Sequence, residues 1–598
     1  MSFEFAPGAE ASRPPQSLAV LASRRLIFAL LVAATTIVMS ALFAIMLAHP
    51  DFGILDCLLI ALFALTLICP TIGMWNSLIG FVILHVAREP LASVIPPAAR
   101  ARDDDPIVTR TAIVMTMRNE NPARPFASLA AMRRDLDASR YGEHFDFFVL
   151  SDSTAPDVIA AEEREVAAFR ATFGESRLIY RRRTSNVGYK GGNIHEFCER
   201  FGKNYVFFVP LDIDSLMTAA RVLRLIRIMQ RNPQLGILQS LGCGLPTDSF
   251  FARVFGFGHR LGMLCFVYGA DWWQGDCCQF WGHNAAIRLE PFTTQCRLPV
   301  LSGEPPFGGH IICHDQIEAA FMRRAGFEVR FLPEQSGTYE GNPPTAPDFV
   351  KRNTRWCRGN LQNLRLIGAS GLTATSRFHL AYMAGKFFTA VAVVIFVVLA
   401  ALAAASRPAD EPFPATAATA LLAAWFAIYL MPRLIGTLDA SIRHAESYGG
   451  AGRLVVGAIT EIVFTVLLTP ISMFEAAYAT LVFLYGGSVE WDGQHRDGYR
   501  MRWQQVYGAM WRPTLFGAIL LALLAIAAPA ALPWFLPFLA GLVLAAPFTV
   551  ATSSAALGAL AQRWRLCATP DEFDTPPAVA EMLPLLRDCG KAGATRGT

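Results

Sequence analysis

The sequence has too little charge for a soluble protein of its size. Only 17% of its 598 residues are charged, whereas 53% are hydrophobic, and an average soluble chain carries about 25% charged residues. The mean hydropathy is +0.36. This composition excludes a disordered, collagen-like or wholly cytosolic protein, and it indicates a chain that is partly embedded in a membrane.

Two other features that could indicate function are also missing. The 52 basic and 48 acidic residues leave a net charge of only +4, scattered along the chain, which does not indicate nucleic-acid binding. The twelve cysteines form no C-x-x-C pair. The adjacent Cys277 and Cys278 have no second Cys or His cluster at metal-ligand spacing, so we expect free thiols.

Long apolar runs predict about eight membrane spans, since a bilayer needs about 20 apolar residues per helix. We expect the run at 454–489 to cross twice, because Glu461, Pro470 and Glu475 divide it, and the proline-broken run at 514–561 to do the same. The remaining four spans are expected at 26–48, 57–86, 387–406 and 415–431.

Basic residues predict the topology, because short cytoplasmic loops accumulate Lys and Arg. The loops at 49–56 and 407–414 hold a single Arg between them. If 454–489 crosses twice, ten arginines flank spans on the opposite side: Arg24, Arg25, Arg443, Arg453, Arg496, Arg500, Arg502, Arg512, Arg563 and Arg565. The expected division is a cytoplasmic tail at 1–25, two transmembrane helices at 26–86, a cytoplasmic domain at 103–376, about six transmembrane or interfacial helices at 377–561 with a cytoplasmic loop at 490–512, and a cytoplasmic tail at 562–598.

The soluble insert reads as an α/β domain with a mostly parallel sheet. Helical segments at 155–173 and 216–230 alternate with apolar strands. Each strand ends on a polar tip, and the strands are expected at 111–117, 146–150 and 205–211. Ligands of open α/β sheets bind outside the carboxyl ends of the strands, so these tips predict the site.

Two motifs near the tips suggest chemistry. Asp212 and Asp214 form a D-x-D directly after a strand, which favours a divalent-metal role over helix capping. The same pattern at 103–105 and 135–137 follows no strand. Lys190 lies in a glycine-rich stretch at 186–193 that suits phosphate binding, although a simple turn before a helix at 194–201 explains it equally well.

The order of the motifs resembles that of the processive family-2 glycosyltransferases. After Asp152, Lys190 and the D-x-D come Gly282-His283-Asn284, then Cys313-His314-Asp315, then Arg352-Asn-Thr-Arg355-Trp356. The last two replace the family's T-E-D and Q-x-x-R-W. Together with Trp356-Cys-Arg-Gly-Asn360 and Trp491-Asp-Gly-Gln494-His-Arg496-Asp497, these departures make residues 20 to 560 similar to the glucans biosynthesis glucosyltransferase H family of Gram-negative bacteria.

The resemblance implies a GT-A fold and an inverting, UDP-glucose-dependent hexosyltransferase that builds osmoregulated periplasmic glucan across the inner membrane. It implies Asp315 as general base, with Asp212 and Asp214 holding Mg²⁺ or Mn²⁺. The residues implied to bind the nucleotide sugar are Thr116, Arg118, Asn119, Glu120, Asp152, Lys190, Asp212, Arg352 and Arg355. Those implied for the acceptor are Gly282, His283, Asn284 and Trp356, although Trp356 also suits an interfacial anchor.

Three further expectations follow. A loop carrying Trp491, Gln494, Arg496 and Asp497 would cover the nucleotide sugar. Glu461 and Glu475 would either contact passing glucan or make helix-packing contacts. The partners would be UDP-glucose, the growing glucan, lipid, and by resemblance acyl carrier protein and periplasmic glucan-modifying proteins. Two other readings are a non-processive lipid-linked sugar transferase and a transporter with a regulatory nucleotide-sugar domain.

Overall fold

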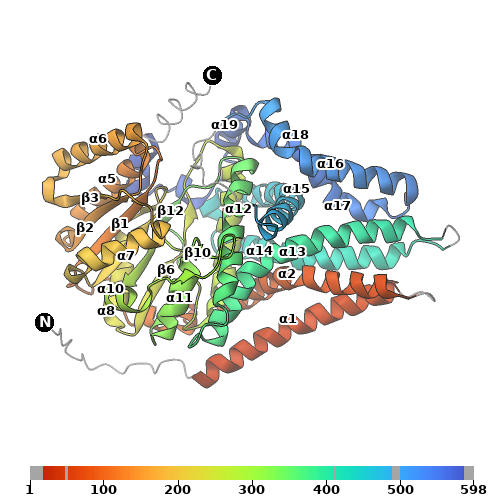
Figure 1. Ribbon diagram of the computed structural model, residues 1–598, viewed down its shortest axis with the longest axis horizontal. Coiled ribbons are helices and arrows are strands. Elements are labelled where there is room, and N and C mark those ends of the chain that lie inside the picture. The colour runs from red at the N-terminus through yellow and green to blue at the C-terminus, as the bar shows by residue number, and fades with distance from the viewer. Residues whose placement is uncertain (1–17, 48–51, 409–410, 488–498, 585–598) are drawn as a thin grey trace.

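The protein has two halves, a sheet-containing domain and a bundle of long helices (Figure 1). The computed structural model describes residues 18–47, 52–408, 411–487 and 499–584. The bundle contains α1 (Leu18–Leu47), α2 (Ile54–Val86), α13 (Ala374–Ala405), α14 (Ala415–Arg443), α15 (Ala451–Leu484), α16 (Trp503–Ala527), α17 (Leu532–Val543), α18 (Ala545–Thr552) and α19 (Ala555–Trp564).

The domain is built around a seven-stranded sheet. In spatial order its strands are β11 (Glu328–Leu332), β6 (Leu235–Ser240), β8 (Ala285–Arg288), β4 (Phe207–Leu211), β1 (Thr111–Met117), β2 (Phe145–Ser151) and β3 (Leu178–Arg182). Only β8 runs antiparallel to its neighbours in this sheet. The predicted α/β class, with a mostly parallel sheet, is confirmed.

Helices cover both faces of the sheet, which explains why its strands are almost continuously apolar. In β1, Ile113 and Met115 belong to one buried cluster, while Ala112 and Val114 belong to the cluster on the other face. The domain helices are α3 (Pro90–Val94), α4 (Pro96–Ala99), α5 (Ala123–Ala138), α6 (Pro156–Phe173), α7 (Tyr189–Phe201), α8 (Ala219–Arg231), α9 (Phe250–Gln274), α10 (Leu289–Gln295), α11 (Asp315–Arg324) and α12 (Ala346–Asn363).

Two small sheets complete the domain. The first is a hairpin of β9 (Val300–Leu301) and β10 (Gly309–His310), and the second places β12 (Thr338–Glu340) between β5 (Leu216–Met217) and β7 (Cys243–Gly244). The helix expected at 216–230 therefore begins later than predicted. Residues 216 and 217 extend to pair with β12, and Thr218 then caps α8 by accepting a hydrogen bond from the Arg221 backbone N–H.

Helix α9 joins the domain to the bundle. A methyl group on Gly80 of α2 would lie 1.8 Å from the Cys265 carbonyl oxygen, and one on Gly269 would lie 1.8 Å from the Asn76 carbonyl oxygen. Gly436 of α14 approaches the Leu261 carbonyl in the same way. Small residues let helix backbones approach this closely, so α9 packs directly on α2 and α14.

Seven helices in the described part of the chain are long and apolar enough to cross a membrane, or eight if the bent pair α17 and α18 counts as one span. By length and composition this number is close to the predicted one of about eight, and it indicates a multi-pass membrane protein. It includes α15, whose two ends both contact the domain. One of the seven is α9, which the sequence analysis placed inside the soluble domain without recognising its apolar length.

The predicted double crossing at 454–489 is wrong, because α15 is one continuous helix from Ala451 to Leu484. Glu461 does not break it, since Arg433 of α14 donates to its carboxylate at 2.8 Å and Thr465 at 2.7 Å. Of the two roles considered for Glu461, the structure shows a helix-packing contact.

Both ends of α15 nevertheless contact the domain. Near its start, Gly457 packs against Phe257 of α9. Near its end, the rings of Phe483 and Phe307 are 5.1 Å apart. After the undescribed segment, the hydroxyl of Tyr499 donates to Asp348 of α12 at 3.2 Å. Arg500 and Arg502, the first described arginines after α15, therefore lie close to the domain although α15 does not cross twice.

The described part of the segment expected as a cytoplasmic tail at 562–598 packs onto the domain. Val579 and Met582 belong to its main buried cluster. The Tyr339 hydroxyl donates to Asp571 at 2.7 Å, and Arg253 donates to Glu572 at 2.7 Å. The predicted loop at 490–512 is also shorter, since α16 begins at Trp503.

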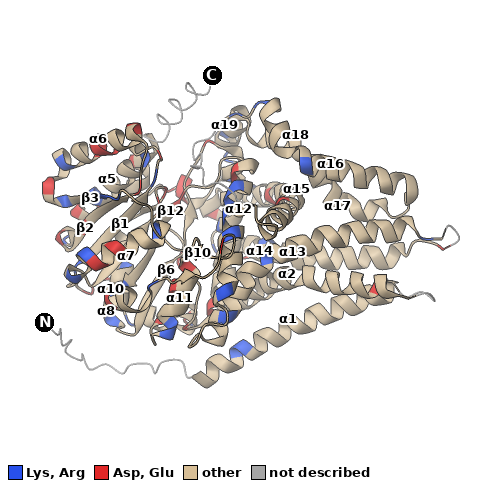
Figure 2. Cartoon of the chain, viewed as in Figure 1, with Lys and Arg blue, Asp and Glu red and all other residues tan. Residues whose placement is uncertain are grey.

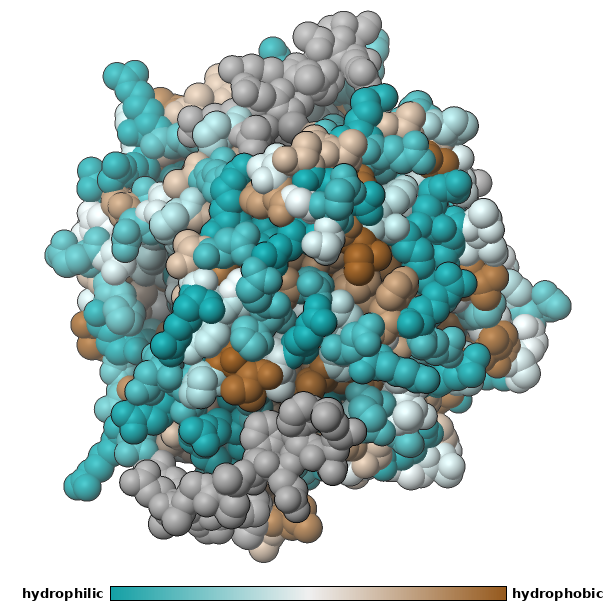
Figure 3. All heavy atoms as spheres, turned by 90° about the vertical axis from the view of Figure 1, so that its left-hand side faces the viewer, coloured by the Kyte–Doolittle hydropathy of each residue, from teal (hydrophilic) through white to brown (hydrophobic). Residues whose placement is uncertain are grey.

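The two halves differ in their content of charged residues. Figure 2 shows charged residues concentrated in the domain and at the helix ends beside it, with few along the far parts of the bundle helices. The domain end of the molecule is largely covered by hydrophilic residues (Figure 3). This distribution suits a bundle in lipid and a domain in water.

The course of α15 predicts the accessibility of its ends. We expect Gly452→Cys and Tyr485→Cys to react with an impermeant thiol reagent from the same side of the membrane as Lys203→Cys in the domain, and from the opposite side to Pro412→Cys. The measurement is labelling of spheroplasts and inverted vesicles in a background without reactive native cysteines. Labelling of Tyr485→Cys in step with Pro412→Cys would mean that α15 crosses the membrane.

Candidate active site

The predicted polar tips meet at one edge of the sheet. Strand β1 lies between β4 and β2, so the residues after these three strands are neighbours. Asp212 follows β4, Arg118 to Glu120 follow β1, and Asp152 follows β2. After β1, the strands β2 and β3 are added on one side of it, and β4 is added on the other side. Open α/β sheets bind their ligands at such a reversal of strand order.

Asp152 is held by a buried ion pair. Arg183, directly after β3, donates to both Asp152 oxygens at 2.7 and 2.8 Å, and the two side chains are only 6% and 8% exposed. The Asn186 amide, with its oxygen toward Arg118, accepts from that residue at 2.7 Å and donates to Asp152 at 3.0 Å. Arg118, Asp152 and Asn186 thus form one connected group.

The loop after β1 is fixed to the loop after β2. Asn119, with φ of 50°, donates its backbone N–H to Ser153, and its side-chain oxygen accepts from the backbones of Thr154 and Ala155. Thr116 is the second-last residue of β1 and is partly buried. These contacts hold the predicted nucleotide-binding loop rigid.

Lys190 contacts the first aspartate of the D-x-D. The Lys190 ammonium donates to Asp212 Oδ1 at 2.5 Å and to the Gly282 carbonyl at 2.9 Å. Asp214 is nearly fully buried, and its Oδ2 would lie 3.2 Å from a methyl group on Gly341. Three separate motifs therefore converge within one set of contacts.

The glycines around Lys190 lie at the start of a helix. Helix α7 already begins at Tyr189, so the glycine run forms its first turn and not a loop before residue 194. A methyl group on Gly192 would lie 2.3 Å from the Val187 carbonyl oxygen, and one on Gly191 would lie 3.2 Å from His314 Cβ. These glycines let α7 approach the protein's own backbone and α11.

Asp315 is the first residue of α11 and lies beside Gly282. A methyl group on Gly282, where φ is 84°, would be 3.3 Å from Asp315 Cβ. Burial raises the pKa of Asp315; the neighbouring His314 opposes this rise and Glu318 adds to it. Burial also lowers the pKa of His314, but Glu318, 2.8 Å from its Nδ1, outweighs that effect and raises it.

Helix α12 brings two arginines to the same region. Burial lowers the pKa of Arg352 to about 10, while Glu340 opposes that shift. Burial also lowers the pKa of Arg355, against the influence of Glu120 and Asp212. The guanidinium of Arg352 lies 4.7 Å from the ring centre of Trp356, whose side chain is 47% exposed.

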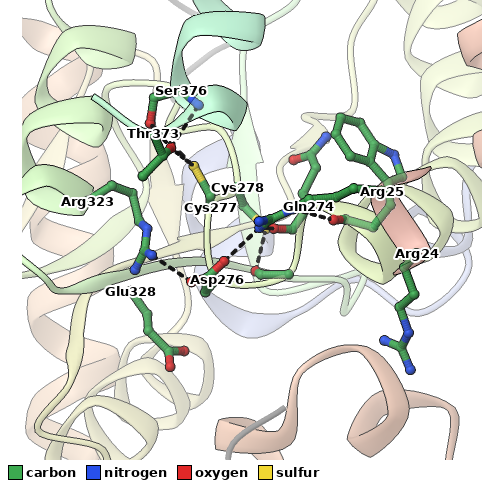
Figure 4. A network of polar contacts seen from close by, with 12 residues as sticks. Arg24, Arg25, Gln274, Asp276, Cys277, Cys278, Arg323, Glu328, Thr373 and Ser376 are labelled. Atoms are coloured by element: carbon green, nitrogen blue, oxygen red, sulfur yellow. Dashed lines mark hydrogen bonds and ion pairs between the residues drawn. The ribbon is translucent and has the colours of Figure 1, made fainter. Parts of the chain in front are cut away.

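The loop from α9 to β8 is anchored at several points before it reaches the site. Figure 4 shows Asp276 between Arg25 of α1, at 2.8 Å, and Arg323 of α11, at 2.6 Å. Cys277, a free thiol like Cys278, lies 3.4 Å from the Ser376 hydroxyl at the start of α13. Gly282, His283 and Asn284 follow directly, so their position is set by three helices.

The carboxylates fit a hard divalent cation only in part. Among the described residues, no group of three or more His, Cys, Asp or Glu side chains is arranged to hold a metal. Asp212 and Asp214 supply an all-oxygen donor set of the kind that Mg²⁺ or Mn²⁺ completes with substrate phosphate oxygens. The donor set therefore suits a cation that is bound together with a diphosphate.

Two residues of this region escaped the sequence analysis. Arg183 lies in a run of three arginines, and Glu340 lies in no motif, so neither carried a local signal. His283, predicted for the acceptor, faces both Glu340 and Asp212. The predicted covering loop with Trp491, Gln494, Arg496 and Asp497 lies outside the described residues and stays a prediction.

The Asp152 ion pair generates a prediction. Arg183→Gln leaves a buried carboxylate without its cation, which typically costs about 3–5 kcal/mol. We expect a lower melting temperature in detergent and weaker UDP binding by calorimetry. Arg182→Gln, at the exposed neighbouring position, is the matched control and should resemble the wild type. Equal melting temperatures for the two variants would contradict the role given to the pair.

Comparisons with known proteins agree with this arrangement. The sequence profile described as Glycosyl transferase family group 2 matches residues 207–432. A glucans biosynthesis glucosyltransferase H of Xanthomonas campestris is 32% identical over 553 residues, which cover 90% of this chain and 85% of the relative. The Ralstonia nicotianae protein of the same name is 34% identical, covering 95% of this chain and 67% of the relative.

Among solved structures, a mannosyltransferase of Pyrobaculum calidifontis in complex with GDP-Man and Mn²⁺ matches with a TM-score of 0.38 and 14% identity, covering 62% of this chain and 99% of that one. The similarity to the Xanthomonas relative over 90% of this chain and the matching profile lead to one conclusion. The chain belongs to the glucans biosynthesis glucosyltransferase H family.

Proposed function

We propose that the protein transfers glucosyl units from UDP-glucose to a growing β-linked glucan, with inversion at the anomeric carbon. The observation that carries this proposal is the meeting of Lys190, Asp212 and the Gly282 carbonyl, with Asp315 also beside Gly282. A candidate base and a cation suited to phosphate thus lie at one short loop, and such proximity favours a single displacement.

The reaction follows from this placement. Asp315 accepts the proton of the acceptor hydroxyl, the hydroxyl oxygen bonds to the anomeric carbon, and the bond from that carbon to the diphosphate oxygen breaks. Negative charge grows on the departing UDP, and the fixed ammonium of Lys190 and guanidinium of Arg355 stabilise it. Asp212 and Asp214 would hold Mg²⁺ or Mn²⁺, which supplies additional positive charge at the diphosphate.

The remaining residues bind and orient. In this proposal Thr116, Arg118, Asn119, Glu120 and Asp152 hold the uridine part of the donor. The exposed ring of Trp356 packs against an acceptor glucose, with Arg352 stacked on its other side. Buried positive charge is more effective than charge in water, so the burial of the two arginines of α12 supports their place near the phosphates.

The same proposal places the protein in the bacterial inner membrane, with the domain in the cytoplasm and the glucan passing outward through the bundle. Its support is that α12, which carries Trp356, packs directly on α15. Cys357 lies 3.4 Å from the Thr480 hydroxyl, and Asn353 donates to Ser472 at 3.5 Å. Trp356, the predicted acceptor residue on α12, therefore lies on a helix that packs against the bundle.

Donor choice tests the proposal. Vesicles containing the purified protein are incubated with labelled UDP-glucose, UDP-galactose or UDP-N-acetylglucosamine and Mg²⁺ or Mn²⁺. We expect polymer from UDP-glucose alone, sensitive to a β-glucanase and absent with a chelator. Label recovered as single sugars on extracted lipid would instead identify a lipid-linked sugar transferase.

A base variant tests the mechanism. Asp315→Asn should lower glucan synthesis by about 10²–10⁴-fold, the usual contribution of a general base, while UDP affinity changes less than about twofold. Asp157→Asn, also in the first turn of a helix but exposed, is the control and should retain activity. A parallel loss of UDP affinity in Asp315→Asn would move Asp315 into the nucleotide site.

The dependence of wild-type activity on pH is a second test of Asp315 as the general base. Its carboxyl must be ionised to accept a proton, and burial raises its pKa above that of a free aspartate. Activity should therefore be full above this raised pKa and fall as the pH drops through it, at a higher pH than an ordinary aspartate would give.

A further inference from the structure

Glu340 is an unassigned carboxylate beside the reaction centre. It ends β12, which pairs with β5, the strand that begins two residues after Asp214. The next residue, Gly341, lies against the Asp214 carboxylate. Glu340 thus reaches the D-x-D through strand pairing across more than 120 residues of sequence, which explains why no motif reveals it.

The strand that carries Glu340 is firmly held. The hydroxyl of Tyr339 donates to Asp571 of the C-terminal segment at 2.7 Å, and the Leu245 N–H donates to the Glu340 carbonyl at 2.9 Å. Gly242 passes beside the carboxylate, where a methyl group would lie 3.6 Å from Glu340 Cδ. The position of the carboxylate is therefore fixed before any substrate arrives, as an efficient binding residue requires.

The Glu340 carboxylate lies near the His283 imidazole and close enough to Arg352 to act on its guanidinium. Glu340 Oε2 is 3.5 Å from His283 Nε2, beyond ordinary hydrogen-bond distance, and the Glu340 side chain is 29% exposed. It also acts electrostatically on the buried Arg352. His283 turns the same nitrogen toward Asp212 Oδ2, 3.9 Å away. Glu340 is therefore oriented by charge while its oxygens can still accept hydrogen bonds.

The loop that contains His283 and Asn284 has buried polar atoms for which no hydrogen-bond partner is found in the described part of the chain. Among the described residues, no hydrogen-bond partner is found for His283 Nδ1 or for either side-chain atom of Asn284, and Asn284 is only 1% exposed. Buried polar atoms normally have partners. The exposed ring of Trp356, stacked on Arg352, supplies an apolar face in the same region.

A carboxylate, an imidazole and an aromatic ring together suit a sugar. The hydroxyl groups of a hexose donate hydrogen bonds to carboxylate oxygens, and its C–H face packs on aromatic rings. A closed ion pair with His283 does not account for Glu340, since its carboxylate oxygen is 3.5 Å from the imidazole nitrogen and the side chain remains 29% exposed.

We propose that Glu340, positioned by His283 and Arg352, binds hydroxyl groups of the hexose at the reaction centre and determines which sugar is accepted there. The hexose is either the glucosyl unit of the donor or the terminal unit of the acceptor, and both offer the same hydroxyl chemistry. This inference rests on the proposed function, since it requires a hexose at this place.

The test compares Glu340→Gln, which keeps the shape and removes the charge, with Glu163→Gln, an exposed position on α6. Glu340→Asp serves as the conservative variant. Reconstituted proteins are assayed for UDP affinity, melting temperature, polymer formation, and hydrolysis of UDP-glucose to free glucose. We expect unchanged UDP affinity and melting temperature in Glu340→Gln, and a loss of kcat/KM for polymer of about tenfold or more, as for one hydrogen bond to a charged group.

The two sources of the hexose give different patterns, and either supports the proposal. If Glu340 binds the donor glucosyl unit, hydrolysis falls together with polymer formation, and discrimination against UDP-galactose changes. If it binds the acceptor, polymer formation falls while hydrolysis is kept. Glu340→Asp should recover part of the lost rate in both cases.

Three results would overturn the proposal. A parallel fall in UDP affinity would place Glu340 in the nucleotide or metal site. A lower melting temperature in both Glu340 variants would give it a purely structural role. Wild-type rates in Glu340→Gln would leave it without a role. If the wild type uses a hexose donor other than UDP-glucose, the proposed donor is wrong, and the same comparison is made with that donor.

Discussion

The close crossing of α9 with α2 and α14 fixes the relation between the two halves of the protein. At Gly80, Gly269 and Gly436, a single added methyl group would overlap a backbone carbonyl of the opposing helix. Backbones at this separation leave no room for sliding, because each helix occupies the groove of the other. The domain is therefore joined to the bundle by a helix of its own, and not by a flexible linker.

This constraint extends to the active site through the loop that leaves α9. Asp276 joins Arg25 of α1 to Arg323 of α11, and α11 begins with Asp315. The same loop ends at Gly282, whose carbonyl accepts from Lys190. The candidate base, the phosphate-binding lysine and the first membrane helix are thus parts of one continuous set of contacts, which keeps the charges of the site in place before substrate binds.

The parts of the site that the sequence predicted are those where local pattern determines position. An apolar strand followed by Asp212 or Asp152 places a carboxylate at the sheet edge, because parallel strands align their carboxyl ends. Glu340 and Arg183 reach the site through pairings between distant strands, which no local pattern encodes. The course of α15 was missed for a related reason, since Glu461 looks like a helix break until Arg433 of another helix is brought beside it.

The same distinction applies to α9 and to the C-terminal segment. Composition correctly separated apolar spans from the polar domain, yet α9 is both, and hydropathy alone could not show that a domain helix lies within the bundle. The residues after α19 were expected as a cytoplasmic tail. Apolar side chains among them, including Val579 and Met582, belong to the main buried cluster of the domain.

The packing of the C-terminal segment has a consequence for biosynthesis. The domain core contains side chains from both Ile113 and Met582, so it stays incomplete until the ribosome has passed residue 582. The bundle helices α13 to α19 are translated between the main part of the domain and this segment. Closure of the domain core therefore follows synthesis of these helices, and a chain that stalls or misinserts late exposes apolar surface that quality-control proteases can recognise.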